Sequence, residues 1–509
     1  MRRRLVAALA VVALLAAACG DDGAPTALEA NSIPPATDTT GTAVTGTTPG
    51  GGDLTPEIKW GKANNGVQLG TIEVPVDYND ASLGTFTLPL ARHLATNKDE
   101  RIGSLLVNPG GPGAPGLEWG VAAQANFGKD IVDRFDIIGF DPRGTGRSTP
   151  AIDCFSDYDH FYDSTDITPD DSTERQQVVD LAEELAGDCA TENAKILQHV
   201  GTNDTARDLD SIRRALGEDT ISYIGFSYGS MLGAVWATMF PTTVRAAVLD
   251  GAPDPTAHGV EPAIAQAKGF EQALENFFAD CAKDTKCAFH NGGDPATAFD
   301  ALMHQIDEHP LPALDGRPDL QLGAALNAVT GALYLESDWP RLAQALDAAQ
   351  GGDGSKLMEL YDEAYFQNGD PTNEDLIEAF NTIFCMDQST RTTVAEEDAA
   401  VPELQAAAPH LALGTTGGYF CTFFPPSDDP LIEVTGAGAP PILVLGTTGD
   451  PATPLASSRK MADALQNGVL LVVDSNNHTG YHNNTCAAKT VNRYLIDPTD
   501  MPDDGQECT

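Results

Sequence analysis

Short apolar runs rich in Val, Ile and Leu recur along the chain, and most are followed by a longer segment with apolar residues at helical spacing. Short runs bounded by turns predict buried strands, and apolar positions three and four apart predict helices. The first two strands, joined across residues 79–82, predict an antiparallel entry to a sheet. In chain order the expected strands are residues 67–78, 84–94, 102–107, 135–141, 220–224, 244–249, 441–446 and 469–473.

Between about residue 256 and residue 430 this alternation stops and helical segments dominate, with helices expected at residues 261–281, 295–308, 339–349, 356–365 and 373–384. A helical insertion between two strands of one sheet predicts a lid over that sheet. The fold class is therefore α/β, with a mostly parallel sheet and an inserted helical lid. The expected parts are a signal peptide (1–18), a linker (19–53), a first core segment (54–255), the lid (256–430) and a second core segment (431–509).

The stretch from Thr220 to Phe240 carries the clearest chemical signal. An apolar, β-branched run breaks at Gly225-Phe-Ser227-Tyr-Gly229 and continues into an apolar segment of helical length. This pattern predicts the strand, sharp turn and helix of a nucleophile elbow, in which Ser227 is lifted clear of the sheet at a helix N-terminus. A chance G-x-S-x-G in a glycine-rich chain is the alternative, and the flanking strand and helix argue against it.

A glycine-rich loop, Asn108-Pro-Gly110-Gly111-Pro-Gly113, follows the strand at residues 102–107. A phosphate-binding loop would end in Gly-Lys-Ser or Gly-Lys-Thr, and this one does not. Its place before the elbow fits a loop that supplies a backbone N–H to an oxyanion hole. We expect the Gly111 amide, with Gly110 as its neighbour, to act together with the amide of Tyr228. A purely structural turn is the alternative.

An acid and a histidine follow two late strands. In the α/β-hydrolase pattern the triad occurs in the order Ser, acid, His, which Ser227, Asp450 and His478 satisfy. His478 would act as general base and Asp450 would orient it. Asp250 is an alternative acid and His482 an alternative base. His478 and His482 also mimic an H-x-x-x-H metal pair, but no glutamate follows His478 and the segment is expected to be a loop, so no metal is expected.

Charge restricts the partners of this protein. The 509 residues include 29 Lys and Arg against 74 Asp and Glu, which gives a net charge of −45. Such a surface repels phosphate backbones and anionic headgroups, so nucleic-acid binding is not expected. Arg143 and Arg147, in the loop after the strand at residues 135–141, are expected to hold loops around the elbow through carboxylate pairs.

The N-terminus predicts export. Three arginines precede an apolar run that ends in small residues just before Cys19, which is typical of a signal peptide. Cys19 at the first mature position indicates a bacterial lipobox, so we expect a lipidated cysteine anchored to the outer face of the membrane. A plain secretory signal with an incidental cysteine is the alternative. Residues 20–53 contain no aromatic and few large aliphatic side chains, and they predict a disordered tether.

Several short motifs occur together in this chain: Asn108–Gly113, Asp141-Pro-Arg-Gly-Thr-Gly-Arg-Ser148, Arg207-Asp-Leu-Asp210, Gly225–Gly229, Leu249-Asp-Gly251, Gly446-Thr-Thr-Gly-Asp450 and the tail from His478 to Cys508. With these motifs the chain resembles the secreted tripeptidyl aminopeptidase family from about Trp60 to its end. This resemblance implies an α/β-hydrolase with a helical lid that cleaves short peptides from a free N-terminus. The chain departs from the pattern of this family in two places. Asn477-His478-Thr479 replaces the commoner Gly-His, and the cysteines usually found near the N-terminal tryptophan are absent.

Nine cysteines are present, and eight are left if Cys19 is lipidated. An even number in an exported protein predicts disulfides, although the sequence leaves their connectivity open. We expect neighbours in chain order to pair, a choice that agrees with the pattern of the family that the chain resembles: Cys154–Cys189, Cys281–Cys287, Cys385–Cys421 and Cys486–Cys508.

Three classes of function stay open from the sequence. A serine exopeptidase acting on peptides is favoured by the motif set, an esterase or lipase shares the same triad, and a surface-binding lipoprotein would have lost activity. No cofactor is expected, and the oligomeric state is left open. An aminopeptidase must bind a cationic α-amine, so its lid should present a carboxylate. Candidates in the insertion are Asp280, Asp284, Glu336, Asp338, Glu374 and Asp375.

Overall fold

The computed structural model describes residues 56–155, 160, 168–169, 171–365, 376–411 and 418–509. The predicted signal peptide, Cys19 and linker lie outside the described residues, as do Glu374 and Asp375. The described ranges contain no helix with the length and apolar character of a membrane span.

Within the described residues, ten strands form one sheet in the order β1-β2-β3-β5-β4-β6-β7-β8-β9-β10. Strands β1, β2, β3 and β5 pair antiparallel to one another, and all pairs from β5 onward are parallel. The mostly parallel sheet predicted from the sequence is thus confirmed. The strands are β1 (Ile58–Trp60), β2 (Val67–Pro75), β3 (Thr85–His93), β4 (Gly103–Asn108), β5 (Phe135–Phe140), β6 (Ile221–Phe226), β7 (Val244–Asp250), β8 (Ile442–Thr447), β9 (Gly468–Val473) and β10 (Gln506–Cys508).

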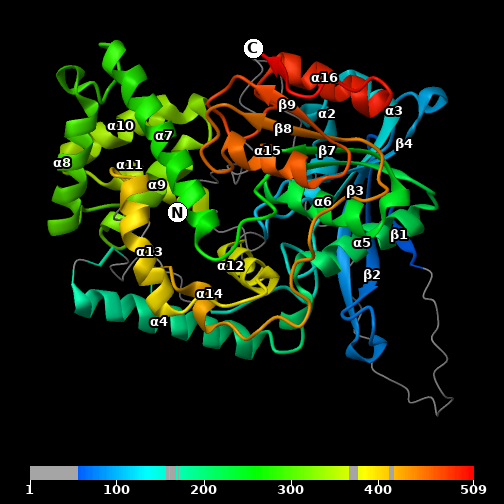
Figure 1. Cartoon of the computed structure of the whole chain (residues 1–509), viewed down its shortest axis with the longest axis horizontal. Helices are drawn as coiled ribbons and strands as arrows, with labels where there is room; N and C mark the ends of the chain where they lie inside the picture. Colours follow the sequence, from blue (N-terminus) through cyan, green and yellow to red (C-terminus); the bar gives the residue numbers. More distant parts are fainter. Residues whose placement is uncertain (1–55, 156–159, 161–167, 170, 366–375, 412–417) are drawn as a thin grey trace, which may run out of the picture.

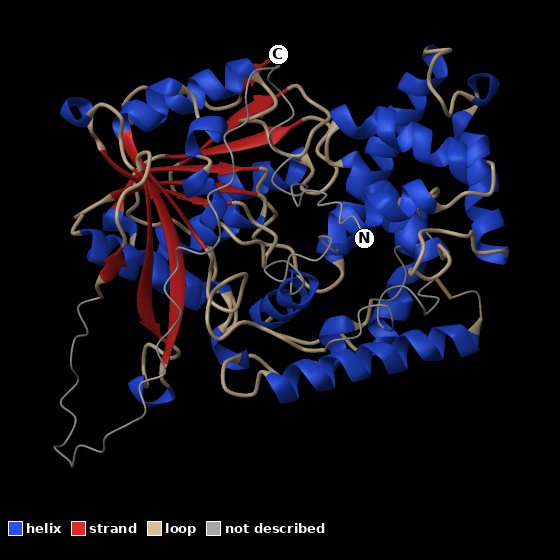
Figure 2. Cartoon of the chain, turned by 180° about the vertical axis from the view of Figure 1, so that it is seen from behind, coloured by secondary structure: helices blue, strands red, loops and turns tan. Residues whose placement is uncertain are grey.

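Helices cover both faces of this sheet, because the central strands are apolar on both sides and must be buried on both (Figure 2). One face packs against α1 (Leu117–Val121), α2 (Ala123–Asn126), α3 (Lys129–Arg134) and α16 (Thr485–Ile496). The other face packs against α5 (Thr202–Leu216), α6 (Tyr228–Met239) and α15 (Leu455–Ala464).

The segment between β7 and β8 is helical and has an apolar core of its own (Figure 1). That core is built from α7 (Glu261–Lys283), α8 (Pro295–Glu308), α9 (Leu322–Leu333), α10 (Trp339–Gln350), α11 (Ser355–Tyr365) and α13 (Val394–Ala407). Two further helices of the segment, α12 (Leu376–Asp387) and α14 (Phe420–Phe423), pack instead on the core of the sheet. The lid therefore has an outer part with its own core and an inner part that belongs to the hydrolase core.

Helix α4 (Ser172–Glu192) precedes the elbow in sequence but lies along the lid (Figure 1). Its buried Val178, Val179 and Ala182 form a small apolar cluster with Tyr419. The covering layer over the active face is consequently made from two separate parts of the chain.

Several helices carry no clear signal in the sequence and were not predicted. Helix α9 is built largely from Ala, Gly and Leu and is buried nearly all round, so it lacks an amphipathic stripe. Helix α13 contains Pro402, and a proline argues against a helix interior in a sequence. Its start is marked by a capping box formed by Thr393 and Glu396. Helices α1 to α3 are too short for a periodic pattern to develop.

Four disulfides are formed, and they join neighbours in chain order: Cys154–Cys189, Cys281–Cys287, Cys385–Cys421 and Cys486–Cys508. Disulfides persist in oxidising compartments, so they mark an exported protein. The Cys385–Cys421 bond ties α12 to α14, within the part of the lid that packs on the core.

Arg143, in the loop after β5, is fully buried and lies in a carboxylate pair, as predicted. Its guanidinium donates to both oxygens of Asp208, at 2.7 and 2.6 Å, and also to backbone carbonyls of Pro75, Val76 and His199. The hydroxyl of Tyr78 donates to Asp208 Oδ1 at 2.7 Å. Arg147 pairs with Glu118 at 3.1 Å.

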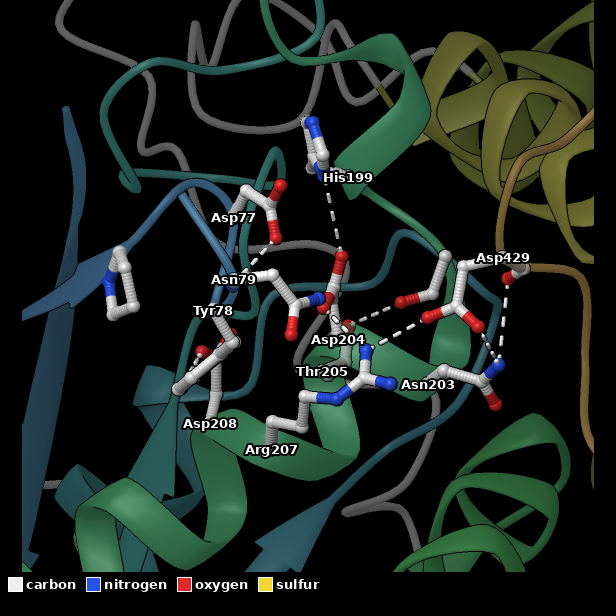
Figure 3. Close-up of polar contacts among 12 residues, drawn as sticks. Asp77, Tyr78, Asn79, His199, Asn203, Asp204, Thr205, Arg207, Asp208 and Asp429 are labelled. Carbon is white, nitrogen blue, oxygen red and sulfur yellow. Dashed lines mark hydrogen bonds and ion pairs between the residues drawn. The ribbon is translucent and has the colours of Figure 1, made fainter. Parts of the chain in front are cut away.

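The same end of α5 carries a second chain of ion pairs (Figure 3). Arg207 Nη1 lies 2.6 Å from Asp204 Oδ1 and 2.7 Å from Asp429 Oδ2, and Asn203 donates to Asp429 Oδ1 at 3.0 Å. Asp429 stands in the segment that leads to β8. These contacts therefore fix the connection from the lid back to the sheet.

We predict that Asp208→Ala lowers the free energy of unfolding by about 3–5 kcal/mol, because it leaves the buried Arg143 guanidinium without its main partner. Urea denaturation followed by circular dichroism measures the change. Glu73→Gln is the matched control, since its pair with Lys59 is exposed and should change stability by less than about 1 kcal/mol. Equal effects of the two substitutions would contradict the prediction.

Candidate active site

Ser227 occupies a strained turn between β6 and α6. Its backbone has φ 56° and ψ −126°, in the region that non-glycine residues seldom adopt. The Ser227 N–H donates to the carbonyl oxygen of Asp250 at 2.8 Å, which ties the turn to the neighbouring strand β7. The geometry is that of a nucleophile elbow.

Gly225 and Gly229 must both be glycine, because other backbone atoms lie too close to them for a side chain. A Cβ atom on Gly225 would lie 2.2 Å from the carbonyl oxygen of Gly229, and one on Gly229 would lie 2.6 Å from that of Asn108. Neither distance leaves room for a methyl group. The elbow and the glycine-rich loop at residues 108–113 therefore pack directly on each other.

His478 and Asp450 meet beside this turn, each from the loop that follows a parallel strand. His478 Nδ1 lies 2.8 Å from Asp450 Oδ1, and both side chains are nearly or fully buried. Asp450 also accepts from the amides of Ala452 and Thr453, at 3.0 and 2.8 Å, and from the Thr453 hydroxyl at 3.1 Å. The carboxylate is thus fixed before it meets the imidazole.

The second ring nitrogen of His478, Nε2, is buried and has no hydrogen-bond partner in the described part of the chain. No hydrogen bond joins it to Ser227 Oγ, as is common before substrate binds. A Cβ on Gly251 would lie 3.2 Å from His478 Cε1, and Gly251 follows the residue that holds the Ser227 amide. Hence the imidazole lies next to the elbow.

Burial disfavours the charged form of His478, but the facing Asp450 carboxylate outweighs it and raises the pKa of His478 above its ordinary value. An ion pair of this kind stabilises an imidazolium and fixes the tautomer of the neutral ring. The site can therefore accept a proton at Nε2.

The two alternative residues have other roles in the structure. Asp250 is fully buried and accepts from the amides of Gly480 and Tyr481, both at 2.8 Å. Burial raises the pKa of Asp250 to about 6, although these two amides act against the rise. His482 Nε2 lies 2.9 Å from the carbonyl of Asn126, and its ring packs among aromatic side chains in the core. Burial lowers the pKa of His482.

The glycine-rich loop packs against the elbow next to Ser227. A Cβ on Gly110 would be 3.0 Å from Ser227 Cβ and 3.2 Å from the amide nitrogen of Tyr228. Gly110 and Gly111 have φ values of 103° and 102°, which favour glycine. Asn108 Oδ1 accepts from the Gly110 amide at 3.0 Å and fixes the loop.

The sequence did not reveal how the lid and Thr453 support the histidine. The His478 amide donates to the carbonyl of Tyr334 at 2.8 Å, and the two rings meet edge to face with centroids 5.3 Å apart. Thr453 Oγ1 lies 3.3 Å from His478 Nδ1. Thr453 follows Asp450 by three residues, a spacing at which a carboxylate often accepts from nearby backbone amides, so the sequence carries a local signal for this contact. The sequence carries no such signal for the contact of Tyr334 with His478.

Comparison with known proteins identifies the family. Residues 103–291 match the family model described as alpha/beta hydrolase fold, and residues 396–508 match the one described as TAP-like protein. Serine protease Hip1 of Mycobacterium tuberculosis is 36% identical over 471 residues, which cover 88% of each chain. The chain belongs to the TAP-like α/β-hydrolase family. It is a serine hydrolase.

Two further relatives of this TAP-like hydrolase are named for different activities. A protein of Mycobacterium tuberculosis named carboxylesterase B is 34% identical over 496 residues, covering 92% of this chain and 94% of its own. The tripeptidyl aminopeptidase of Streptomyces coelicolor is 29% identical over 450 residues, covering 84% and 81%. The family therefore includes proteins named for amide and for ester substrates.

We predict that Gly225→Ala lowers the free energy of unfolding by about 1–3 kcal/mol, because the new methyl group would overlap the Gly229 carbonyl. Gly187→Ala is the matched control. Gly187 lies in α4 with nothing within 4 Å of the position that a methyl group would take, so alanine there should raise stability by about 0.4–1 kcal/mol. Thermal and urea unfolding measure both, and a stable Gly225→Ala protein would show that the elbow can relax.

Proposed function

We propose that this hydrolase is an exported aminopeptidase that releases short peptides, tripeptides above all, from free N-termini. Ser227, Asp450 and His478 would form its triad. The observation that carries the proposal is the 2.8 Å contact of His478 Nδ1 with Asp450 beside an elbow serine. The relatives named as a serine protease and a tripeptidyl aminopeptidase support peptide substrates.

In this mechanism Ser227 Oγ attacks the scissile carbonyl carbon while its proton passes to His478 Nε2. The carbonyl electron pair moves onto oxygen, where the amides of Gly111 and Tyr228 stabilise it. Collapse expels the amine, which takes the proton from the imidazolium, and leaves an acyl-enzyme on Ser227. Water then attacks this ester while His478 takes its proton; collapse breaks the bond to Ser227 Oγ, which regains that proton from His478, and the short N-terminal peptide leaves.

A carboxylate of the lid would bind the α-amine of the substrate. Of the described candidates, Glu336 is the one hydrogen-bonded to the loop that carries His478. Its amide donates to Asn477 Oδ1 at 2.8 Å, and its carboxylate accepts from Asn476 at 3.3 Å. Asp338 lies 4.0 Å from Arg341, and burial raises its pKa. Glu336 is therefore our first choice for the amine site.

The location of the enzyme is part of the proposal. The four disulfides support export, and the Cys19 lipobox supports a lipid anchor on the outer face of the bacterial membrane. Its substrates would then be extracellular peptides. The net charge of −45 argues against nucleic acid and against direct contact with anionic lipid.

An esterase acting on the same site is the second candidate. The relative named carboxylesterase B supports it, and the triad chemistry does not distinguish an ester from an amide. The two functions differ in whether a free α-amine on the substrate matters.

We predict that Ser227 is the one residue labelled by a fluorophosphonate probe, because the elbow and base make its oxygen nucleophilic. Gel fluorescence should detect the wild-type protein and fail to detect Ser227→Ala. Ser230→Ala serves as the control and should keep its labelling, since the Ser230 hydroxyl is buried and donates to backbone carbonyls. Undiminished labelling of Ser227→Ala would place the nucleophile elsewhere.

Mutation distinguishes the two candidates for the acid of the triad, Asp450 and Asp250. Asp450→Asn should lower kcat by several orders of magnitude, because the histidine loses the carboxylate that fixes its tautomer. Asp250→Asn should lower stability while keeping most of kcat, because it accepts only backbone amides. Steady-state kinetics on folded variants measures the difference, and the reverse pattern would make Asp250 the acid.

A free N-terminus should be required. Acetylated tripeptidyl anilides should be cleaved more slowly than their free counterparts by a factor equivalent to about 2–4 kcal/mol, the effect of a lost charge pair. Glu336→Gln should reduce the difference in rate between free and acetylated substrates, whereas Asp284→Asn, at the C-terminal cap of α7, should not. Equal rates on both substrates would refute the exopeptidase and favour the esterase.

A further inference from the structure

Helix α12 of the lid contacts two segments that pack against the elbow, the glycine-rich loop and the start of α5. At one end its backbone meets the glycine-rich loop: a Cβ on Gly113 would lie 2.9 Å from the amide nitrogen of Phe380 and 3.0 Å from Ala379 Cβ. Contact at this distance leaves no space for a side chain between helix and loop. In the cartoon α12 accordingly lies between the sheet and the outer lid helices (Figure 1).

The other end of α12 reaches the residue after the nucleophile. Asp387, the last residue of the helix, accepts from the Thr202 amide at 2.7 Å and from the Thr202 hydroxyl at 2.5 Å. Thr202 Oγ1 is in turn hydrogen-bonded to the hydroxyl of Tyr228. A Cβ on Gly201 would lie 3.1 Å from Asp387 Oδ1, so the carboxylate fits closely against the start of α5.

The direction of these hydrogen bonds follows from the number of protons. In its ionised form the Asp387 carboxylate only accepts, so Thr202 then uses its single hydroxyl proton on Asp387. The Tyr228 hydroxyl must then donate to Thr202. Asp387 thus orders a chain of three side chains that ends on the residue whose amide faces the oxyanion site.

Asp387 is 9% exposed, and no cation is paired with it among the described residues. Burial raises its pKa to about 7, the two Thr202 hydrogen bonds lower it, and the charge of Asp429 raises it further. A buried carboxylate without a cationic partner lowers the stability of the fold, so stability does not explain its presence here.

We propose that Asp387 is a positioning residue for the hydrolase reaction, acting through Thr202 to hold Tyr228 and its amide in place in the oxyanion hole. This inference rests on the proposed function, in which the Tyr228 amide stabilises the tetrahedral intermediate. Oxyanion donors act by being fixed before charge develops, so a donor that can move loses part of its effect in the transition state. Since the amide would act on the charge that develops in the transition state, kcat should change and KM should change little.

Tyr228→Phe and Thr202→Val test the inference, because each removes one hydroxyl and keeps the shape of the side chain. Each should lower kcat on a short-chain chromogenic ester about tenfold with KM within about twofold, less than the 10²–10³ for a lost oxyanion donor. The double variant should be no worse than either single variant, because both break one chain. Thr202→Ser should keep most of the activity, and Asp387→Asn should resemble Thr202→Val.

Tyr78→Phe is the matched control, since Tyr78 also joins a buried aspartate and a hydroxyl but lies in the Arg143 network. It should lower the melting temperature and leave kcat unchanged. Wild-type kcat in Tyr228→Phe and Thr202→Val, or losses that multiply in the double variant, would overturn the inference. Because ester turnover is the readout, failure to cleave tripeptidyl anilides would count against the peptidase proposal alone.

Discussion

Two segments of the site are joined by one buried residue, Asp250, at the end of β7. Its backbone carbonyl accepts the Ser227 amide, and its carboxylate accepts the amides of Gly480 and Tyr481, just after His478. One residue therefore links the turn that carries the nucleophile to the loop that carries the histidine. A fully buried acid is unfavourable by itself, and these two amide donors offset its burial.

The lid is an integral part of this site. The Tyr334 carbonyl holds the His478 amide from one side, and α12 packs on the glycine-rich loop from the other. The disulfide between Cys385 and Cys421 fastens α12 to α14. Both parts of the inserted segment thus contact the site, since Tyr334 packs against the outer apolar core and α12 packs on the core of the sheet.

The fold could be predicted, and so could the contact between Asp450 and His478. Parallel strands bring the loops that follow them to one edge of the sheet, whatever their separation in sequence. Local patterns sufficed for the elbow and the glycine-rich loop. The contacts of Asp387 with Thr202 and of Tyr334 with His478 could not be predicted, since each joins distant segments without a motif. Helix α9 was missed for a related reason: a helix buried on all sides has no polar face to mark its period.

The path of α4 has a consequence for biosynthesis. Tyr419 covers the apolar face of α4, which is formed by Val178, Val179 and Ala182. At the start of the helix, Arg175 pairs with Asp398. A ribosome delivers α4 long before those partners, so the nascent chain must carry an uncovered apolar helix through the synthesis of the elbow and most of the lid. Secretion in an unfolded state would remove that exposure, because the whole chain would then be available when folding begins outside the cell.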